Sequence, residues 1–539
     1  MNVNQSLYEV IASRANQNPN FIALQFMGKR ITYFDLLQNI DKSAFGLSQL
    51  GIKKGNVITI CMPNVFEVIY TFYAGVKLGA ICHMVHPLTP VKQLKTQMIE
   101  TNSKLLMVVD TFYDTYHLMT KELNVPLILV TPVDSFGLIK KVGYKVINKK
   151  RLANIQVDNL VIPYKKLIEK NGHIETASVD SKTSAVYLHS GGTSGTPKTI
   201  ELSHFSINSL ANQTEYILDE HDFENKHMLA VLPMFHGFGL CMGVHAMLVY
   251  GGVDTLMPKF NAKDTISLIK KNQINYLIGV PTLFEALLNT NDFAGPHLKN
   301  LKQAFVGGDY VSPTLKERFN KVMAENNSHA QLLEGYGLTE VVTVCAVNTI
   351  FEQKLGTVGK PLPGIDIKIV DLETKEVLPV NTLGEIAVSG PTRMNGYLHD
   401  KLATSSTFKK IDDKIYVLTG DYGMIDDEGY VVFKQRLKRI IKVSGMPVLP
   451  SEIETLVSAL PGISEVAAVG VKDQERGNMI KLFVTIKPGA EIKVTDDEIK
   501  QMIKAELSIY AVPKSIVYLD KMPKTIIGKI DTKILETLE

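Results

Sequence analysis

The chain has 539 residues, and its 58 lysines and arginines nearly balance 55 aspartates and glutamates, for a formal net charge of +3. This length can bury several cores, and so balanced a charge argues against nucleic acid as the main partner. The four cysteines show neither CxxC nor Cys/His spacing, which argues against a zinc site and a disulfide framework and favours a reducing cytoplasm. The first residues also lack the pattern of a secretory signal.

Helical and strand-like patterns alternate over the first 430 residues. A helix is expected over residues 65–79, and the short apolar run 80–82 follows it as a strand. Such alternation is typical of an α/β protein with buried, largely parallel sheets. The sequence therefore predicts a large N-terminal body of mostly parallel sheets packed with helices.

A run of seven serine, threonine and glycine residues precedes Pro197 and Lys198. The run is Ser190, Gly191, Gly192, Thr193, Ser194, Gly195 and Thr196. Glycines let backbone N–H groups turn toward an anion, hydroxyls add donors and the lysine adds positive charge, so the run predicts phosphate binding. It matches neither a Walker A loop nor GxGxxG, and a flexible polar linker is the alternative.

The flanks of this run indicate how it is held. Apolar residues 185–188 precede it, and residues 199–202 follow with period-two alternation. Both patterns predict strands, so the phosphate-binding run would be a hairpin loop rather than a helix N-terminus. The next helix would be capped by Ser203.

No charged residue occurs from Met228 to Val253, and a segment of this length could span a membrane. The segment contains Pro233, two histidines and several glycines. We therefore expect a buried strand, a turn and an apolar helix, with a membrane span as the alternative.

After Glu352 the sequence pattern changes to that of short strands and turns, with strands expected over 365–370, 384–388 and 429–433. This predicts a β-barrel-like subdomain over about 353–435. The basic stretch 435–439 precedes a region with strands at 466–471 and 481–486 and helices at 451–459 and 496–507. The predicted domains are a large N-terminal domain at 1–435, a hinge at 436–439 and a small α+β domain at 440–539.

Four further clusters stand far apart in the chain. They are Glu334-Gly335-Tyr336-Gly337-Leu338-Thr339-Glu340, Thr419-Gly420-Asp421, Arg436, and Pro523-Lys524-Thr525-Ile526-Ile527-Gly528-Lys529. The first offers an aromatic face, a hydroxyl and two carboxylates, and the second ends a strand with a carboxylate suited to two ribose hydroxyls. Taken singly, Lys529 would be a solvated charge, and Asp421 with Arg436 a surface ion pair.

In this order the clusters resemble the adenylate-forming superfamily of acyl-CoA synthetases, luciferases and peptide-synthetase adenylation domains. The resemblance covers about residues 8 to 535 and is strongest to AMP-dependent fatty acyl-CoA synthetases. It implies two half-reactions: a carboxylate attacks the α-phosphate of ATP to give an acyl-adenylate and pyrophosphate, and the thiol of coenzyme A then attacks the acyl carbon. Positioning and charge stabilisation would supply the rate.

The same resemblance assigns a nucleotide site with residues from every cluster. The adenine site would comprise Gly308, Asp309, Glu334, Tyr336 and Gly337; the ribose site Asp421 and Arg436; and the phosphate site the loop from Ser190 to Lys198 with Thr339 and Glu340. Thr193 and Glu340 match the family's magnesium positions, and hard oxygen ligands suit Mg²⁺.

Lys529 matches the family's catalytic lysine, a cation placed where charge develops between the carboxylate and the α-phosphate. The resemblance implies that the C-terminal domain rotates about Lys438 between the half-reactions. Rotation would withdraw Lys529 and bring in a thiol tunnel at Lys442 and Gly445. With Lys529, the implied catalytic residues are Thr339, Glu340 and His236.

The stretch 232–237 matches the family's acyl-pocket segment, and it lacks the aspartate with which peptide-synthetase domains pair an α-ammonium group. The implied acyl pocket includes His236, Gly237 and Gly307, with a hydrogen-bonded core histidine as the alternative for His236. Glycines at 237, 239, 243 and 307 are compatible with a deep slot for an acyl chain. A medium- to long-chain fatty acid is therefore predicted.

Residues 138–152 place apolar side chains at four-residue spacing among lysines and an arginine, which predicts a basic amphipathic helix on anionic lipid or, alternatively, a solvated basic face.

The predicted location is cytoplasmic, with peripheral membrane association, as a monomer or homodimer. The alternatives for function are an acyl-AMP ligase that loads an acyl carrier protein, a CoA ligase for an aromatic or short acid, and a noncatalytic binding protein. A hydrolase is disfavoured because the run lacks GxSxG.

Three positions depart from the family pattern. Thr199 replaces the glycine usual after the loop lysine, Gln435 replaces the glycine before the ribose arginine, and Asn478 stands where many relatives have glutamate. None of these changes removes a charged catalytic group.

Overall fold

The computed structural model describes residues 1–131, 144, 148, 154–190, 197–271, 273–473, 476–490, 494–524 and 530–538. The chain forms two compact units: residues 1–367 with 388–417, and residues 368–387 with 418–539. Each unit is described by itself below. The predicted hinge at 436–439 concerns a movement and stays a prediction.

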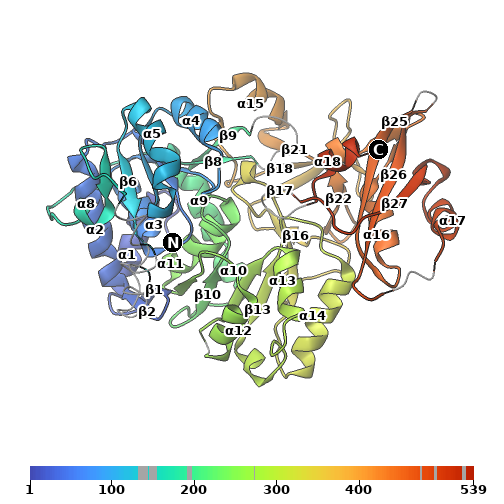
Figure 1. Ribbon diagram of the computed structural model, residues 1–539, viewed down its shortest axis with the longest axis horizontal. Helices are drawn as coiled ribbons and strands as arrows, with labels where there is room; N and C mark the ends of the chain where they lie inside the picture. The colour runs from blue at the N-terminus through green and yellow to red at the C-terminus, as the bar shows by residue number, and fades with distance from the viewer. Residues whose placement is uncertain are drawn as a thin grey trace. The chain divides into compact units, whose positions relative to one another are not determined.

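A nine-stranded sheet forms part of the first unit (Figure 1). Its order is β16 (Lys360–Pro361), β15 (Ala346–Val347), β14 (Leu332–Tyr336), β13 (Gln303–Val306), β12 (Tyr276–Gly279), β10 (His227–Ala230), β11 (Val253–Leu256), β1 (Ile22–Phe26) and β2 (Lys29–Thr32). The strands from β14 to β1 are parallel, while β15, β16 and β2 are antiparallel.

An eight-stranded sheet of the same unit carries the serine, threonine and glycine run. Its order is β19 (Gly396–Tyr397), β9 (Thr199–Ser203), β8 (Ser184–His189), β4 (Ile81–Met84), β3 (Val57–Cys61), β5 (Ser103–Val109), β6 (Leu127–Val130) and β7 (Val161–Pro163). The six strands from β8 to β7 are parallel. Together the two sheets confirm the predicted α/β class with mostly parallel, buried strands.

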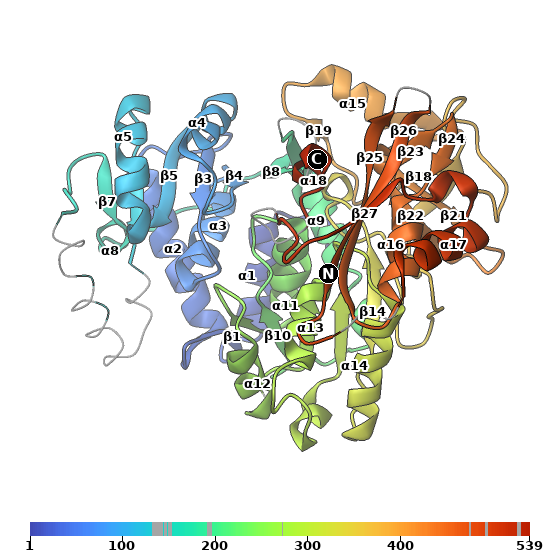
Figure 2. The same ribbon diagram turned by 45° about the vertical axis from the view of Figure 1, so that its right-hand side comes forward.

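Helices cover both sheets in layers (Figures 1 and 2). Packed against the outer face of the eight-stranded sheet are α4 (Val91–Glu100) and α5 (Tyr113–Leu123). The large core that joins the two sheets includes α1 (Leu7–Gln17), α2 (Tyr33–Gln49), α3 (Phe66–Lys77), α9 (His204–Ala211), the π-helix η3 (Phe238–His245) and α11 (Ala246–Tyr250). The outer face of the nine-stranded sheet packs against α12 (Ala262–Lys270), α13 (Pro281–Leu288) and α14 (Pro313–Glu325).

Several local predictions are confirmed by these elements. The helix expected over 65–79 is α3, and the hairpin around the run is the antiparallel pair β8 and β9. Ser203 caps α9 in a capping box with Ser206. The uncharged segment 228–253 is a buried strand followed by η3 and α11, and no helix among the described residues has the length and apolar character needed to cross a membrane.

Short antiparallel strands follow residue 352, as predicted. They form a five-stranded sheet of β17 (Asp366–Val370), β18 (Gly384–Ser389), β21 (Lys414–Ile425), β20 (Phe408–Ile411) and β22 (Val431–Arg436), next to α15 (Lys401–Thr407). This sheet supplies Asp421 and Arg436 from neighbouring strands.

The C-terminal region is the predicted α+β arrangement. It contains η6 (Leu437–Arg439), β23 (Ile441–Val443), β24 (Met446–Val448), α16 (Pro450–Ser458), β25 (Ile463–Asp473), β26 (Gly477–Ile486), α17 (Asp496–Glu506), β27 (Ser515–Tyr518) and α18 (Thr532–Thr537). Strands β25, β26 and β27 form one sheet, and α16 and α17 pack against it over a small apolar core.

Candidate active site

The ends of β8 and β9 hold the root of the serine, threonine and glycine run. The Ser190 N–H donates to the Lys198 carbonyl at 3.0 Å, and the Lys198 N–H donates to Ser190 Oγ at 3.1 Å. These two bonds close the loop at its base and fix where the Lys198 side chain leaves the backbone. Residues 191–196, and with them Thr193, lie outside the described residues.

An aromatic ring joins the loop lysine to Glu340. Lys198 Nζ lies 4.5 Å from the centre of the Tyr397 ring, and the Tyr397 hydroxyl donates to Glu340 Oε1 at 2.9 Å. Burial, together with the charge of Glu340, raises the pKa of Tyr397, so the phenol stays protonated and donates. The Met394 N–H donates to the Glu340 carbonyl at 2.8 Å. Two residues predicted for the phosphate and magnesium sites are therefore brought together by one that was not predicted.

A strained turn follows Glu340. Thr339 begins the short 3₁₀ turn η5 (Thr339–Val341) and is buried, and Val342 has φ 69° and ψ −60°. The Thr343 N–H donates to the Val341 carbonyl at 2.9 Å, which closes a γ-turn around Val342. A β-branched residue at positive φ is costly and persists only where its surroundings hold it.

The predicted adenine residues lie at the carboxyl ends of neighbouring parallel strands. Val306 of β13 pairs with Glu334 of β14, so Gly308 and Asp309 follow one strand while Tyr336 ends the other. In open α/β sheets, ligands bind at this edge. Gly308 and Asp309 are exposed, whereas Tyr336 is buried.

Glu334 is already engaged by two side chains. Its Oε2 accepts from Lys316 Nζ at 2.7 Å and from Asn348 Nδ2 at 2.9 Å, and both partners are buried. The lysine compensates the charge of a carboxylate that would otherwise be costly to bury. We therefore expect Glu334 to shape the site as part of a fixed pair.

The glycines predicted to open an acyl slot instead admit neighbouring backbone. A Cβ at Gly237 would lie 1.9 Å from the Val342 carbonyl oxygen, and one at Gly307 would lie 2.8 Å from the Gly335 carbonyl oxygen. A Cβ at Gly337, predicted for the adenine site, would likewise lie 1.5 Å from the Thr343 carbonyl oxygen. Chain packing therefore requires glycine at these positions, and the place of Gly237 and Gly307 in the acyl pocket stays a prediction.

His236 is exposed, and its Nδ1 accepts from the Phe238 N–H at 3.2 Å. The alternative of a core histidine is therefore wrong. Gly237 and the π-helix η3 follow directly, and π-helical turns occur often at functional sites.

In the second unit, the two residues predicted for the ribose form an ion pair. Arg436 Nη1 lies 3.0 Å from Asp421 Oδ1, and Asp421 is only 1% exposed. The turn before it is held in place because the Gly420 N–H donates to Glu385 Oε1 at 2.9 Å, and Glu385 pairs with Lys375 at 2.7 Å. Arg436 itself is 54% exposed, so the pair is half-buried, and its buried carboxylate distinguishes it from the weak surface pair of the alternative interpretation.

The predicted hinge and thiol-tunnel residues lie at the start of the C-terminal region. Lys438 is in η6, and Lys442 is in β23, with its carbonyl bound by Asn478 Nδ2 at 3.0 Å. Gly445 and Ser444 both have positive φ in the turn between β23 and β24. Such a two-residue turn favours glycine. Lys529 lies outside the described residues, as does all of the basic segment 138–152 except Tyr144 and Asn148.

Comparison with known proteins decides the family. Residues 11–398 match the family described as AMP-binding enzyme, and residues 452–529 match the AMP-binding enzyme C-terminal domain. The chain belongs to the AMP-binding enzyme family. This confirms the predicted adenylate-forming superfamily and the predicted class, an AMP-forming acid–thiol ligase that uses ATP and coenzyme A.

Relatives of this AMP-binding enzyme match over nearly the whole chain. A long-chain-fatty-acid–CoA ligase of Bacillus subtilis is 29% identical, with 98% of this chain and 93% of the relative covered. One of Salmonella typhimurium is 30% identical, with 97% and 92% covered. ATP-bound MatB from Rhodopseudomonas palustris has a similar fold, with a TM-score of 0.86 at 22% identity and coverage of 99% and 98%.

Sequence reasoning missed several side chains that contact the predicted site residues. Tyr397, Lys316 and Asn348 act on predicted residues from distant parts of the AMP-binding enzyme's chain. Buried polar residues beside apolar runs were the available signal, but only strand order identifies their partners.

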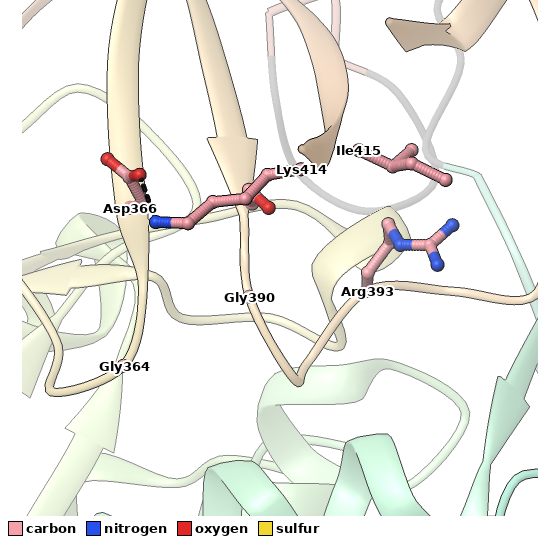
Figure 3. Close-up of a pocket in the computed structure, with 7 residues that line it drawn as sticks. Gly364, Asp366, Gly390, Arg393, Lys414 and Ile415 are labelled. Carbon is pink, nitrogen blue, oxygen red and sulfur yellow. Dashed lines mark hydrogen bonds and ion pairs between the residues drawn. The ribbon is translucent and has the colours of Figure 1, made fainter. Parts of the chain in front are cut away.

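A pocket of about 320 Å³ elsewhere in the first unit is lined by none of the predicted site residues. In Figure 3, Lys414 extends to Asp366, which it contacts at 2.7 Å, while Arg393 points away from that pair. Arg393 lies over the Phe408 ring at 4.8 Å. The two cations therefore do not converge on one position, as a built anion site would require.

Proposed function

We propose that this AMP-binding enzyme converts a medium- to long-chain fatty acid to its coenzyme A thioester. The fatty acid is supported by relatives named long-chain-fatty-acid–CoA ligases that align over 97–98% of the chain. The observation that carries the site assignment is the arrangement of Lys198, Tyr397 and Glu340 at the root of the serine, threonine and glycine run.

In the first half-reaction, a carboxylate oxygen of the acid attacks the α-phosphorus of ATP, and pyrophosphate leaves. The loop from Ser190 to Lys198 covers the β- and γ-phosphates, where Lys198 is held against an aromatic ring rather than a carboxylate. Thr339 contacts the α-phosphate, and Lys529 stabilises the charge that develops there.

The magnesium assignment fits the donor set at Glu340. One of its oxygens is bound by the Tyr397 phenol, and among the described residues no side chain donates to the other. An oxygen ligand of this kind suits Mg²⁺, which supplies charge neutralisation to the phosphates when bound. Tyr397 would orient the carboxylate, and its second oxygen would be available to hold Mg²⁺.

In the second half-reaction, the thiol of coenzyme A attacks the acyl carbon of the adenylate and AMP leaves. Asp421 and Arg436 hold the ribose through both steps, and the C-terminal region turns about Lys438 to exchange Lys529 for the tunnel at Lys442 and Gly445. An acyl carrier protein is the alternative acceptor. The basic segment 138–152 supports association of a cytoplasmic monomer or homodimer with an anionic membrane surface.

The test measures pyrophosphate release with short, medium, long and aromatic acids, with coenzyme A added or withheld. We expect the highest kcat/KM for medium or long chains and thioester only when coenzyme A is present. Lys529→Ala should lose adenylate formation and keep thioester formation from supplied acyl-adenylate. Equal loss of both half-reactions would reject the role of Lys529, and release only with aromatic or short acids would reject the fatty acid.

A further inference from the structure

Five side chains, four of them buried and the fifth partly buried, form a hydrogen-bonded ladder across the eight-stranded sheet. Thr101 Oγ1 lies 2.7 Å from Ser103 Oγ, which lies 2.6 Å from Thr59 Oγ1. Thr59 Oγ1 is 3.0 Å from His83 Nδ1, and His83 Nε2 is 2.7 Å from His189 Nε2. The last four residues come from β5, β3, β4 and β8, which are neighbours in the sheet (Figure 2).

The distances allow either direction, and we assign the one that leaves no buried N–H without an acceptor. Thr101 donates its one hydroxyl proton to the Gln97 carbonyl at 2.8 Å, so it accepts from Ser103. Ser103 has then used its proton and accepts from Thr59, which in turn accepts from His83 Nδ1–H. His83 Nε2 is left as an acceptor, and His189 therefore donates to it from Nε2–H.

This order leaves His189 with an unprotonated Nδ1. That atom is buried and has no hydrogen-bond partner among the described residues. Burial lowers the pKa of His83 well below 6.5 and that of His189 to about 4, so both rings are neutral at pH 7, as the proton count requires. Chains of hydrogen bonds that all point one way strengthen each other.

The ladder ends where the phosphate loop begins. His189 is the last residue of β8, and Ser190 follows with its two bonds to Lys198. On the other side of the root, Thr199 Oγ1 lies 3.5 Å from Glu100 Oε2. Glu100 and Thr101 are adjacent at the end of α4, so one helix end supports both strands that carry the loop.

We propose that His189 is a positioning residue for nucleotide binding. The ladder holds its ring with Nδ1 as an acceptor, and through this fixed ring it sets Ser190 and Lys198 at the phosphates. An unprotonated nitrogen accepts from N–H or O–H groups and has no proton for a phosphate oxygen, so His189 acts through the loop root and not by contact with ATP. The inference rests on the proposed function, in which the loop covers the β- and γ-phosphates.

The ladder can be cut far from the nucleotide. In Thr59→Val, a nearly isosteric change, His83 Nδ1–H loses its acceptor in a buried position. An N–H without an acceptor costs less at His189, which is only partly buried, than at fully buried His83. The proton therefore moves to His83 Nε2, which donates to His189 Nε2 and leaves the proton of His189 on Nδ1. The variant thereby converts the acceptor at the loop root into a donor.

Two readouts test this. In ¹⁵N spectra of histidine-labelled protein, assigned with His83→Gln and His189→Gln, wild type should show protonated His83 Nδ1 and His189 Nε2, and Thr59→Val should show the opposite pair. The KM for ATP should rise about fivefold, the size of one hydrogen bond, while the KM values for the acid and coenzyme A stay within about twofold. Thr59→Ser should restore both readouts.

The matched control is Thr120→Val. Thr120 is equally buried, on α5, and its hydroxyl donates only to carbonyls of its own helix. This control should leave the KM for ATP unchanged. If Thr59→Val does not fold, Ser103→Ala cuts the ladder one step further away and should reverse the same protons.

Opposite tautomers in the wild type would overturn the proton order and the proposal with it. If Thr59→Val reverses the tautomers but leaves the KM for ATP unchanged, the ladder has only a structural role, and the proposal is overturned as well. Lys198→Ala separates the proposed function: if that variant too leaves the KM for ATP unchanged, the loop does not bind the phosphates and the proposed site fails.

Discussion

The carboxylates of Glu340 in the first unit and Asp421 in the second differ in burial and in the partner that compensates their charge. Asp421 is almost fully buried and has a guanidinium at 3.0 Å, whereas Glu340 is half-buried and, within the described part of the chain, its carboxylate receives one hydrogen bond, from a phenol. A buried carboxylate must be paired to stay ionised, but a half-buried one retains water as a partner. The negative charge of Glu340 is therefore available to bind a cation. The charge of Asp421 is instead balanced by Arg436, which fixes the orientation of the carboxylate.

The cations differ in the same way. Arg436 lies against Asp421, so the pair presents oriented hydrogen-bond groups with little net charge. Lys198 lies over the face of Tyr397, an attraction of about 0.5–2 kcal/mol that leaves the ammonium charge uncancelled. Lys198 thus offers an uncompensated positive charge to the phosphates. Asp421 and Arg436 offer oriented hydrogen-bonding groups to the ribose hydroxyls.

Asp421→Asn tests the geometric side and should have the largest effect. The change removes a charged acceptor, so the two charge-assisted hydrogen bonds to the ribose hydroxyls are lost and kcat/KM for ATP should fall by about 100- to 1000-fold. Steady-state kinetics with varied ATP measures this. The control is Glu454→Gln, which breaks the Arg439 pair of the same unit, where the carboxylate is more exposed than Asp421, and should cost less than about threefold. A loss below about tenfold in Asp421→Asn would contradict a ribose role.

Tyr397→Phe tests the charged side and should have a smaller effect. The ring that supports Lys198 remains, but Glu340 loses its orienting hydrogen bond, so the KM for ATP should rise about tenfold at limiting Mg²⁺ and less when Mg²⁺ is saturating. Tyr416→Phe is the matched control, because that hydroxyl also donates to a carboxylate, Asp366 at 2.7 Å. Equal effects in the two variants would show that Tyr397 does not act through the ion.

The parts of the molecule that sequence reasoning identified are those with local signals. The capping box at Ser203, the hairpin around the phosphate run and the helix after Val65 depend on residues a few positions apart. The ordered clusters identified the family because their chemistry is legible in short stretches. Asp421 and Arg436, 15 positions apart, were assigned together in this way.

The parts that were missed depend on strand order. His83 and His189 are 106 residues apart, and they meet only because β4 and β8 are neighbours. Gly237 is required by the carbonyl of Val342, on a strained turn more than a hundred residues later. Hydrophobic periodicity predicts that a residue is buried but not which distant backbone or side chain faces it.

Asp254 on β11 extends the comparison of Glu340 and Asp421 to a buried carboxyl that has no hydrogen-bond partner among the described residues. It is fully buried in the nine-stranded sheet, neither oxygen has a hydrogen-bond partner among the described residues, and burial raises its pKa well above 3.8. The folded chain thus keeps a proton that the unfolded chain loses above that value, so stability falls as pH rises from there toward the folded pKa, by up to about 1.4 kcal/mol per pH unit.

Asp254→Leu, which keeps the side-chain shape, should remove this dependence and leave kcat unchanged. We expect the Tm of the variant to exceed that of wild type by a few degrees at pH 8, by less at pH 6, and by least near pH 4, where the unfolded wild type still holds about half of its proton. Thermal unfolding across that pH range measures the difference, with Thr120→Val as a buried control that carries no titratable group. A constant Tm difference across the range would mean that Asp254 is ionised in the folded protein, and that a carboxylate can be held in this core without the cation that Asp421 has.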